Sequence, residues 1–385
     1  MLRVALKILI GDKAKYIGMI LGLTFASFIV VQQASIFIGL MKRTYGFISD
    51  TSQPNIWVMD PKVEFIDDVK PLSNIELFRV RSIEGVEWAV PLFKGIIRAR
   101  LKDGNFQNTI VVGIDASTFI GRPPEMVEGK IQDLRDTDAI IVNKVGADTK
   151  LAEEIKGSNG TAIPLKVGQT IELNDKRAVV VGICEVSRTF QSQPVIYTTF
   201  LRAQRYAPFE RKNLSFILAH SAPGMKEKEV CQRITAITGL AAYTSKEFAW
   251  KTISYYLKNT GIPINFGVAI GLGFVIGIAI AGQTFYNFTM DNLRYFGTFK
   301  AMGASNALLT KMVLLQSFIV GTIGWGLGIG ATGLFGLISF GTELSFALPW
   351  QLVIASYISM LMICTVAAYF SIARVRRLEP AIVFK

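Results

Sequence analysis

The stretch YIGMILGLTFASFIVVQQASIFIGL, Tyr16–Leu40, decides the fold, because it contains no charged residue and is long enough to cross a bilayer as a helix. Three later stretches have the same character: Ile264–Asn287, Met312–Phe340 and Leu348–Ile372. Only 18% of the chain is charged, whereas soluble domains carry about 25%. The chain is therefore predicted to be a membrane protein.

These stretches divide the chain into membrane and aqueous parts. The predicted boundaries place an amphipathic cytoplasmic helix over 1–15, spans over 16–41, 263–288, 312–340 and 348–372, an extracytoplasmic domain over 42–262, a cytoplasmic loop over 289–311 and a cytoplasmic tail over 373–385. The parts assigned to the cytoplasm hold eleven basic and three acidic residues, as the positive-inside rule requires. Most of the net charge of +12 is explained in this way, so it gives no indication of nucleic-acid binding.

The domain over 42–262 has the pattern of an α+β fold. Short β-branched and aromatic runs predict strands at 55–60, 108–115, 138–143, 177–183 and 213–220, and helical spacing predicts helices at 73–82 and 226–238. The segments LKVGQTIEL and RAVVVGI, with NDK between them, predict a β-hairpin. The predicted fold class is a membrane α-helical protein with four transmembrane helices and a large α+β extracytoplasmic domain between helices 1 and 2.

A helix is expected at the end of this domain, over 244–259. Thr244 and Glu247 have the spacing of a capping box. An apolar stripe follows, formed by Ala249, Ile253, Tyr256 and Leu257. Trp250, Tyr255 and Tyr256 suit a membrane interface, and Pro263 permits a kink before the second span. We interpret this helix as a stalk that transmits position between the domain and that span; the alternative is an ordinary surface helix.

Glycines recur at four-residue spacing in the predicted spans. The pairs are Gly18 and Gly22, Gly267 and Gly271, Gly273 and Gly277, Gly324 and Gly328, and Gly326 and Gly330. Because missing side chains let helix backbones approach closely in lipid, this spacing favours packed helices. No Asp, Glu, Lys, Arg or His lies in a span, which argues against a proton relay or an ion pathway.

The sequence contains no recognisable catalytic or metal-binding pattern. It lacks the G-x-x-x-x-G-K-[ST] phosphate loop and any Cys-x-x-Cys, and its one histidine, His220, argues against a His-rich metal site. Cys184 and Cys231 are either two small buried apolar residues or a disulfide formed in an oxidising compartment. We expect no active site, metal or cofactor in this chain.

The cytoplasmic stretch LRYFGTFKAMGAS, Leu293–Ser305, is too short for a domain and too polar for lipid. A helix here would have Leu293, Phe296 and Lys300 along one side and Tyr295, Phe299 and Met302 along another. Gly303 provides a left-handed stop, and Ser305 can cap the next helix. The helix is either a connector lying on the membrane or a knob that fits a groove on a cytoplasmic partner, for which aromatic and methionine side chains are suited.

The sequence YFGTFKAMGAS resembles the coupling segment of FtsX-like permeases, the membrane subunits of MacB-type ABC transporters. RVRRLEPAIVFK resembles their C-terminal ending, and YYLKNTGIPINFGVAIGLGFVIG and QPVIYTTFLRAQRY are similar to the DevC-like subgroup, permeases of glycolipid-type exporters. The order of spans extends the resemblance over the whole chain, with an FtsX-like permease domain at about 263–385. Tyr295 is a departure, because the family often has Glu at this position, and the docking contact there is left open.

The resemblance implies a homodimer bound to two copies of a separate ABC ATPase, which holds ATP and Mg. The implied ATPase-coupling residues are Leu293, Arg294, Tyr295, Phe296, Thr298, Phe299, Lys300 and Met302. The implied stalk residues are Thr244, Glu247, Trp250 and Tyr256. One of two extracytoplasmic subdomains would be an insertion near residues 116–195, and ATPase closure would move the extracytoplasmic domain through the stalk.

The resemblance further implies a multi-pass protein of the bacterial inner membrane with cytoplasmic N- and C-termini. Its implied function is export of an amphiphile such as a glycolipid, with a periplasmic adaptor, an outer-membrane channel and membrane lipid as partners. The alternatives are a non-transporting permease that regulates a cell-wall hydrolase or a sensor, and haem or lipoprotein release. The sequence identifies neither the cargo nor the residues that bind it.

Overall fold

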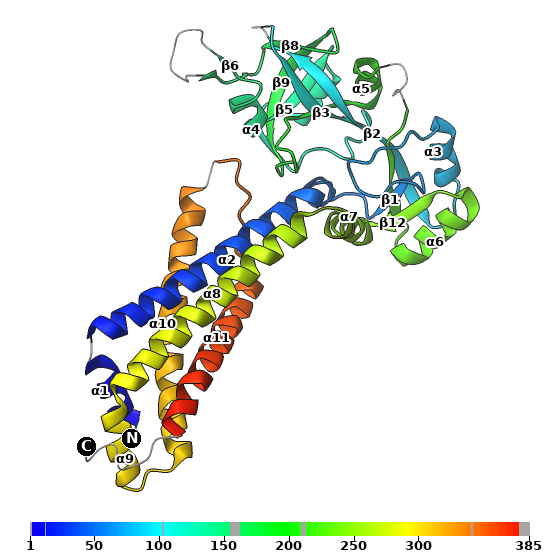
Figure 1. Cartoon of the computed structure of the whole chain (residues 1–385). Helices are drawn as coiled ribbons and strands as arrows, with labels where there is room; N and C mark the ends of the chain where they lie inside the picture. Colours follow the sequence, from blue (N-terminus) through cyan, green and yellow to red (C-terminus); the bar gives the residue numbers. More distant parts are fainter. Residues whose placement is uncertain are drawn as a thin grey trace. The chain divides into compact units, whose positions relative to one another are not determined.

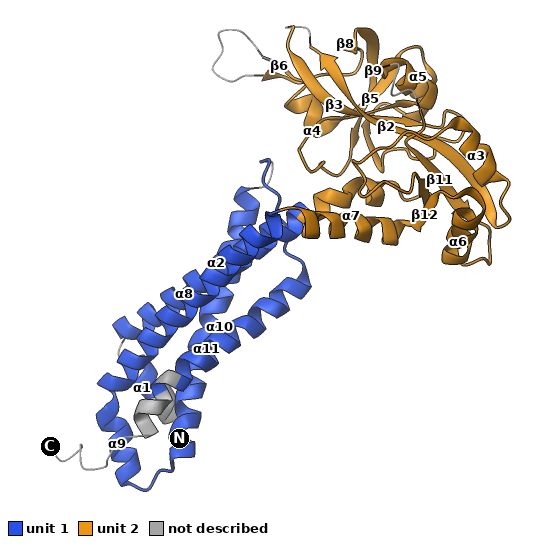
Figure 2. Cartoon of the chain, turned by 45° about the vertical axis from the view of Figure 1, so that its right-hand side comes forward, with its two compact units in different colours: residues 1–40, 261–385 blue, residues 41–260 orange. Residues whose placement is uncertain are grey.

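The computed structural model describes residues 2–11, 13–101, 104–154, 162–208, 213–339 and 342–376. The chain divides into two compact units (Figure 2). Residues 1–40 and 261–385 form the helical unit, and residues 41–260 form the α+β unit. Because the boundaries fall close to those predicted for the first and second spans, the division separates the hydrophobic helices from the mixed domain.

The helical unit is built around long apolar helices (Figure 1). Its elements are α1 (Leu2–Gly11), α2 (Lys13–Asp50) as far as Leu40, α8 (Ile262–Asp291), α9 (Leu293–Ala301), α10 (Asn306–Ile338) and α11 (Trp350–Arg376). Four segments are long and apolar enough to span a membrane: Lys13–Asp50, Ile262–Asp291, Asn306–Ile338 and Trp350–Tyr369. Pro263 lies in the first turn of α8 rather than at a kink, because proline is tolerated where helix N–H groups have no partner.

The N-terminal helix differs from its prediction. One amphipathic helix was expected over 1–15, lying on the membrane surface, but α1 ends at Gly11 and α2 begins at Lys13. Leu9 of α1 is wholly buried in the core of the helical unit, together with Phe285 and Phe288 of α8. Helix α1 therefore packs on the other helices of the unit rather than lying only on a lipid surface.

Only some of the predicted glycine pairs lie at helix contacts. A Cβ atom added at Gly324 would lie 2.8 Å from Cβ of Leu23, and one added at Gly328 would lie 2.6 Å from Cβ of Ser27, so α10 packs closely on α2. Gly273 and Gly277 also face α2, at 3.0 Å from Ile29 and Ala26 respectively. Apart from the backbone of the same helix and the adjoining residues, no atom of the described residues lies within 4 Å of a Cβ added at five others: Gly18, Gly267, Gly271, Gly326 and Gly330. The four-residue spacing therefore identifies close-packed helices without telling which face is packed.

The α+β unit is organised by one continuous sheet. Its strand order is β12 (Ala241–Thr244), β1 (Ile56–Met59), β11 (Phe216–Ser221), β2 (Val86–Arg100), β3 (Phe106–Ile114), β10 (Val195–Thr199), β5 (Ala139–Asn143), β9 (Lys176–Glu185) and β4 (Glu125–Glu128), with β8 (Thr170–Leu173) paired to β2 and β9. A separate pair is formed by β6 (Glu153–Glu154) and β7 (Ala162–Ile163). The helices are α3 (Asn74–Arg81), α4 (Lys144–Asp148), α5 (Phe200–Tyr206), α6 (Glu227–Thr238) and α7 (Ser245–Asn259), with a 3₁₀ turn at Ile131–Arg135.

Strand β2 joins the two halves of this unit. Its first half pairs with β11, from Val86 to Leu92, and its second half pairs with β3, from Phe93 to Arg100. The half that contains β11 has a core with α3 and α6, and the half that contains β3 has a core with α4 and α5. A third core, which includes Trp57, contains residues from both halves.

The predicted strands and helices of the α+β unit are confirmed to within a few residues, and the hairpin is confirmed as β8 and β9. Asn174 and Asp175 in its turn have φ angles of 50° and 59°, as a type I′ turn requires at both central positions. The prediction missed β2, because Pro91, Lys94 and Gly95 interrupt the alternation that identifies a strand. It also missed β4, β10 and β12, together with α4 and α5.

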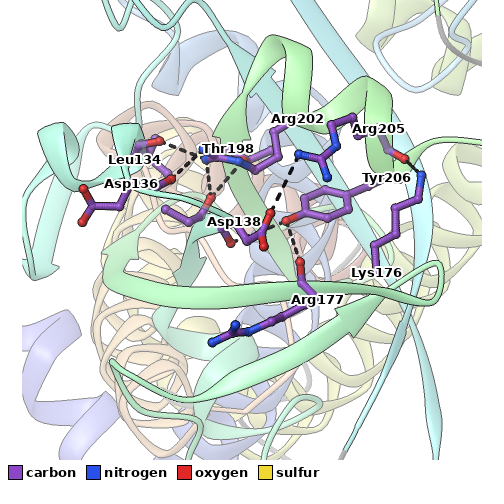
Figure 3. A network of polar contacts seen from close by, with 10 residues as sticks. Leu134, Asp136, Asp138, Lys176, Arg177, Thr198, Arg202, Arg205 and Tyr206 are labelled. Carbon is purple, nitrogen blue, oxygen red and sulfur yellow. Dashed lines mark hydrogen bonds and ion pairs between the residues drawn. The ribbon is translucent and has the colours of Figure 1, made fainter.

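The segment QPVIYTTFLRAQRY forms β10 and α5 and carries a polar network (Figure 3). The guanidinium of Arg202 donates to the backbone oxygens of Leu134 at 2.9 Å, Asp136 at 2.6 Å and Ala139 at 2.9 Å. Tyr206 donates to the backbone oxygen of Arg177 at 3.2 Å, and burial raises its pKa to about 12. These contacts fix α5 on β5 and β9, so this segment has a structural role.

The glycine contacts between α2 and α10 generate a stability prediction. Gly324→Ala combined with Gly328→Ala should lower the unfolding temperature of the detergent-solubilised chain, because each added methyl group lies closer than 3.0 Å to a side chain of α2. Overpacking of this kind costs about 1–3 kcal/mol. Thermal unfolding followed by tryptophan fluorescence measures the effect.

The matched control is Gly326→Ala combined with Gly330→Ala on the same helix. At both positions, an added methyl group would have no side chain or neighbouring helix within 4 Å. This variant should therefore unfold at the same temperature or a higher one, since alanine is the better helix former. Identical unfolding curves for the two double variants would show that α10 does not pack on α2 through this face.

Candidate functional site

Helix α9 turns the chain between two of the long helices. Only Asn292 separates it from α8, and the Asn292 side chain donates to the backbone oxygen of Phe288 at 2.8 Å. After α9, Gly303 has a φ angle of 92°, which favours glycine. Ser305 then caps α10 by accepting a hydrogen bond from the backbone N–H of Leu308 at 3.3 Å. The predicted stop at Gly303 and cap at Ser305 are confirmed.

Phe296 anchors α9 on the helical unit. Its side chain is completely buried in a cluster with Leu309, Met312 and Val313 of α10 and Ala368 of α11. Leu293 and Phe299 are partly buried against the same cluster. Phe299 therefore packs against the same cluster as Phe296, although the prediction had placed the two residues along different sides of the helix. These three predicted coupling residues hold α9 in place.

Among the other predicted coupling residues, Arg294, Tyr295 and Thr298 lie on the opposite side of α9, and Met302 follows at its C-terminal end. Arg294 and Thr298 are exposed, Tyr295 is 58% exposed and Met302 is 68% exposed, whereas Lys300 is half-buried. Aromatic, methionine and arginine side chains are enriched in protein interfaces. We call the four exposed residues the α9 surface: Arg294, Tyr295, Thr298 and Met302.

The predicted stalk helix is α7, and its cap is as predicted. The backbone N–H of Glu247 donates to the Thr244 hydroxyl at 3.2 Å, and the Thr244 N–H donates to the Glu247 carboxylate at 3.1 Å. Lys228 of α6 lies 3.1 Å from that carboxylate. Burial opposes ionisation of Glu247, but the hydrogen bonds from Thr244 and Lys228 outweigh it and lower the pKa of the group.

The buried face of α7 differs from the predicted stripe. Phe248, Thr252 and Tyr256 are buried at four-residue spacing, whereas Leu257 is 37% exposed. Phe248 contacts the ring of Trp57, with ring centroids 5.7 Å apart. Among the predicted stalk residues, Thr244 and Glu247 form the cap, Tyr256 packs in the interior, and Trp250 remains 63% exposed.

Helices α2 and α7 contact one segment of the α+β unit, residues 187–193 between β9 and β10, which we call the bridging segment. Asp50 at the end of α2 accepts hydrogen bonds from the Ser187 N–H at 2.7 Å and the Ser187 hydroxyl at 2.8 Å. Its burial raises the pKa of the Asp50 carboxyl, and the Ser187 hydrogen bonds oppose that rise. The Tyr256 ring of α7 lies 4.8 Å from the ring of Phe190.

The sequence prediction missed the bridging segment. Asp50 lies beyond the predicted first span, and no local pattern connects it with Ser187, which is 137 residues away. The available signal was limited to the two helices on either side of the domain, because the chain enters it through α2 and leaves it through α7.

The remaining candidate groups lie apart from one another. Nδ1 of His220 is 3.1 Å from the Glu87 carboxylate, and its ring stacks on Trp88. Cys184 and Cys231 are free and buried in different cores, so no disulfide joins them. Within the described residues, no three His, Cys, Asp or Glu side chains are grouped as a metal site requires.

Comparison with known proteins identifies two family regions. Residues 17–237 match the MacB-like periplasmic core domain, and residues 240–380 match the FtsX-like permease C-terminal region. The first match alone covers more than half of the chain. Together the matches span α2, the whole α+β unit as far as α6, and the helices that follow.

Two curated relatives are uncharacterised ABC transporter permeases from two strains of Mycobacterium tuberculosis, CDC 1551 and H37Rv. Each is 21% identical over 262 residues, which cover 67% of this chain and 64% of the relative. The matched part thus spans less than two thirds of the relatives' length.

Two solved structures with detectable likeness are of domains outside the membrane. The extracellular domain of the noncanonic ABC-type transporter YknZ from Gram-positive bacteria is 14% identical, with a TM-score of 0.34, over 50% of this chain and 98% of that domain. The periplasmic region of MacB from Actinobacillus actinomycetemcomitans is 12% identical, with a TM-score of 0.37, over 55% of this chain and 96% of that region. With the two family matches, four membrane-spanning helices and a large α+β domain after the first of them, the chain belongs to the MacB/FtsX-type family of ABC transporter permeases.

Proposed function

We propose that this chain is a permease subunit that couples ATP hydrolysis on a separate ATPase chain to motion of its extracytoplasmic domain. The observation that carries the proposal is the division of α9 into a buried anchor at Phe296 and an exposed side at Tyr295 and Met302. An exposed surface on a firmly held helix can receive force from a partner and pass it to the helices at either end. Here those helices are α8 and α10.

The proposed path to the extracytoplasmic domain runs through α8 to α7 and through α2. Both α7 and the end of α2 contact the bridging segment, at Phe190 and Ser187 respectively. Because Phe248 and Tyr256 of α7 are buried against the domain, movement of α7 would displace the residues of the domain core that they contact. Thr244, Glu247 and Tyr256 hold the stalk in place, and Trp250 is its exposed ring.

The spans support a mechanism in which cargo does not pass between them. Charged residues are absent from Tyr16–Leu40, Ile264–Asn287, Met312–Phe340 and Leu348–Ile372, and pathways for ions or polar cargo usually contain them. Gln316 of α10 is buried and polar, and we assign it to helix packing. Cargo would then be taken from the outer leaflet or the periplasm.

The proposed assembly is a homodimer with two copies of the ATPase in the bacterial inner membrane, with both termini of the chain in the cytoplasm. ATP and Mg would be bound by the ATPase. The resemblance to the DevC-like subgroup supports export of an amphiphile such as a glycolipid, together with a periplasmic adaptor and an outer-membrane channel. Membrane lipid would surround the spans.

The orientation predicts a labelling pattern in spheroplasts. All native cysteines are buried, so single cysteines can be introduced with little background. Lys226→Cys, at a side chain that is 83% exposed, should react with a membrane-impermeant maleimide on intact spheroplasts. Arg294→Cys on the α9 surface should react only after lysis, and the opposite pattern would show that the topology is inverted.

The docking role of α9 predicts loss of the ATPase. In the co-expressed complex, Tyr295→Asp combined with Met302→Asp should abolish co-purification of the ABC ATPase, because two carboxylates replace apolar contacts at the centre of the proposed interface. Membrane insertion should persist, since both side chains are exposed.

Phe78→Asp combined with Ile237→Asp is the matched control in the α+β unit, because both side chains are 63% exposed. This control should retain the ATPase at the level of the unmodified chain. Retention of the ATPase by the α9 variant as well would refute the docking assignment.

A further inference from the structure

The α+β unit contains an open groove of about 630 Å³, within the 300–1,000 Å³ range that is typical of small-molecule sites. Its floor is the middle of β2, including Lys94 and Ile96, and its walls include Phe65, Phe190 and Tyr256. Most of the lining side chains are apolar, and amide groups are contributed by Gln191, Gln193 and Asn213. We call this cavity the β2 groove.

Part of the apolar lining of the β2 groove is exposed to solvent. Ile96 lies on a sheet strand and is 50% exposed. Phe65 stacks on Tyr255 with ring centroids 4.3 Å apart, which gives one wall an ordered aromatic surface. Burial of such surface by an apolar chain would be favourable, by roughly 25 cal/mol per Å².

Each charged residue that lines the β2 groove is paired, Asp67 with Lys94 inside the groove and Asp68 with Lys70 beside it. The Lys94 ammonium, whose residue is 5% exposed, is paired with Asp67, and Lys70 lies 2.6 Å from Asp68. An ionised ligand would therefore leave a charge without a counterion in a partly dehydrated site, which is costly. Amide side chains both donate and accept hydrogen bonds, so they suit hydroxyl and carbonyl groups.

We propose that the β2 groove binds an amphiphile with one alkyl or acyl chain and an uncharged, hydroxyl-bearing head group. The chain would lie against Ile96, Phe65 and Phe190, and the head group would bind the amides of Gln191, Gln193 and Asn213. This proposal rests on the proposed export function and specifies where the cargo binds.

The position of the groove connects binding with the proposed motion. Phe190 belongs to the bridging segment, which Asp50 of α2 holds at Ser187, and Tyr256 belongs to α7. Both residues line the groove. A displacement of α2 or α7 would therefore change the groove walls and the affinity for the ligand.

Photo-crosslinking of the full-length chain tests the proposal. The chain and its ATPase are placed in nanodiscs and irradiated with a dodecyl glucoside that carries a diazirine in its alkyl chain, and labelled peptides are identified by mass spectrometry. We expect label on residues 65–71, 93–97 and 189–193. The Ile96→Asp variant should reduce that label at least about tenfold, because it places an unpaired carboxylate against the chain.

Three comparisons make the outcome decisive. Ile237→Asp alters an equally apolar, exposed residue outside the groove and should leave the label unchanged. A fatty acid with the same diazirine chain should label the groove more weakly than the glucoside. Equal or stronger labelling by the fatty acid would contradict the proposed preference for an uncharged head group. Label that is absent from the three segments, or that persists in the folded Ile96→Asp variant, would overturn the site.

The ATPase co-purification test separates this proposal from the proposed function. Suppose that the unmodified chain keeps its ATPase, that the α9 variant loses it, and that the groove is not labelled. This result contradicts the binding site but not the coupling function. Retention of the ATPase by the α9 variant contradicts the coupling function, whatever the groove binds.

Discussion

The hydrocarbon core of a membrane excludes unpaired charge and unsatisfied backbone groups, and the structure depends on this constraint. Four long helices, each with an uncharged central stretch, meet it because their backbone hydrogen bonds are made internally. Apolar burial drives helix association weakly in lipid, so close approach matters, as at Gly324 and Gly328 against α2. Polar and charged surfaces are thereby confined to the parts of the chain outside the spans, which include the α+β unit and the turn that contains α9.

Those two aqueous parts carry complementary features. On α9, burial of Phe296 fixes a short helix whose other side is exposed at Tyr295 and Met302. In the α+β unit, α2 and α7 contact the bridging segment through Asp50 and Tyr256. Mechanical coupling between an ATPase and an extracytoplasmic domain requires two features. One is a surface that can bind a partner, and the other is a domain that is contacted by helices leading into the membrane. The family membership of the chain agrees with this interpretation.

Local physical rules predicted much of the fold. Hydrophobic length identified the four long helices, and the T-x-x-E pattern identified the cap of α7. The rules failed where partners distant in sequence decide the outcome: β2 is a strand despite Pro91 and Gly95 because β11 and β3 pair with its two halves. Likewise, the coupling stretch was recognisable by its sequence, but only packing against α10 and α11 shows that Phe296 and Phe299 face inward. The Asp50–Ser187 contact and the β2 groove had no local signal.

In the proposed mechanism, nucleotide binding by the ATPase moves the α+β unit relative to the helical unit. Double electron–electron resonance between spin labels at Lys226→Cys and Leu344→Cys tests this movement directly. The native cysteines are buried and both introduced positions are exposed. The complex would carry an ATPase that binds but does not hydrolyse ATP. We predict that ATP with Mg shifts the distance distribution between the labels. An unchanged distribution in a complex that has bound ATP would contradict the account.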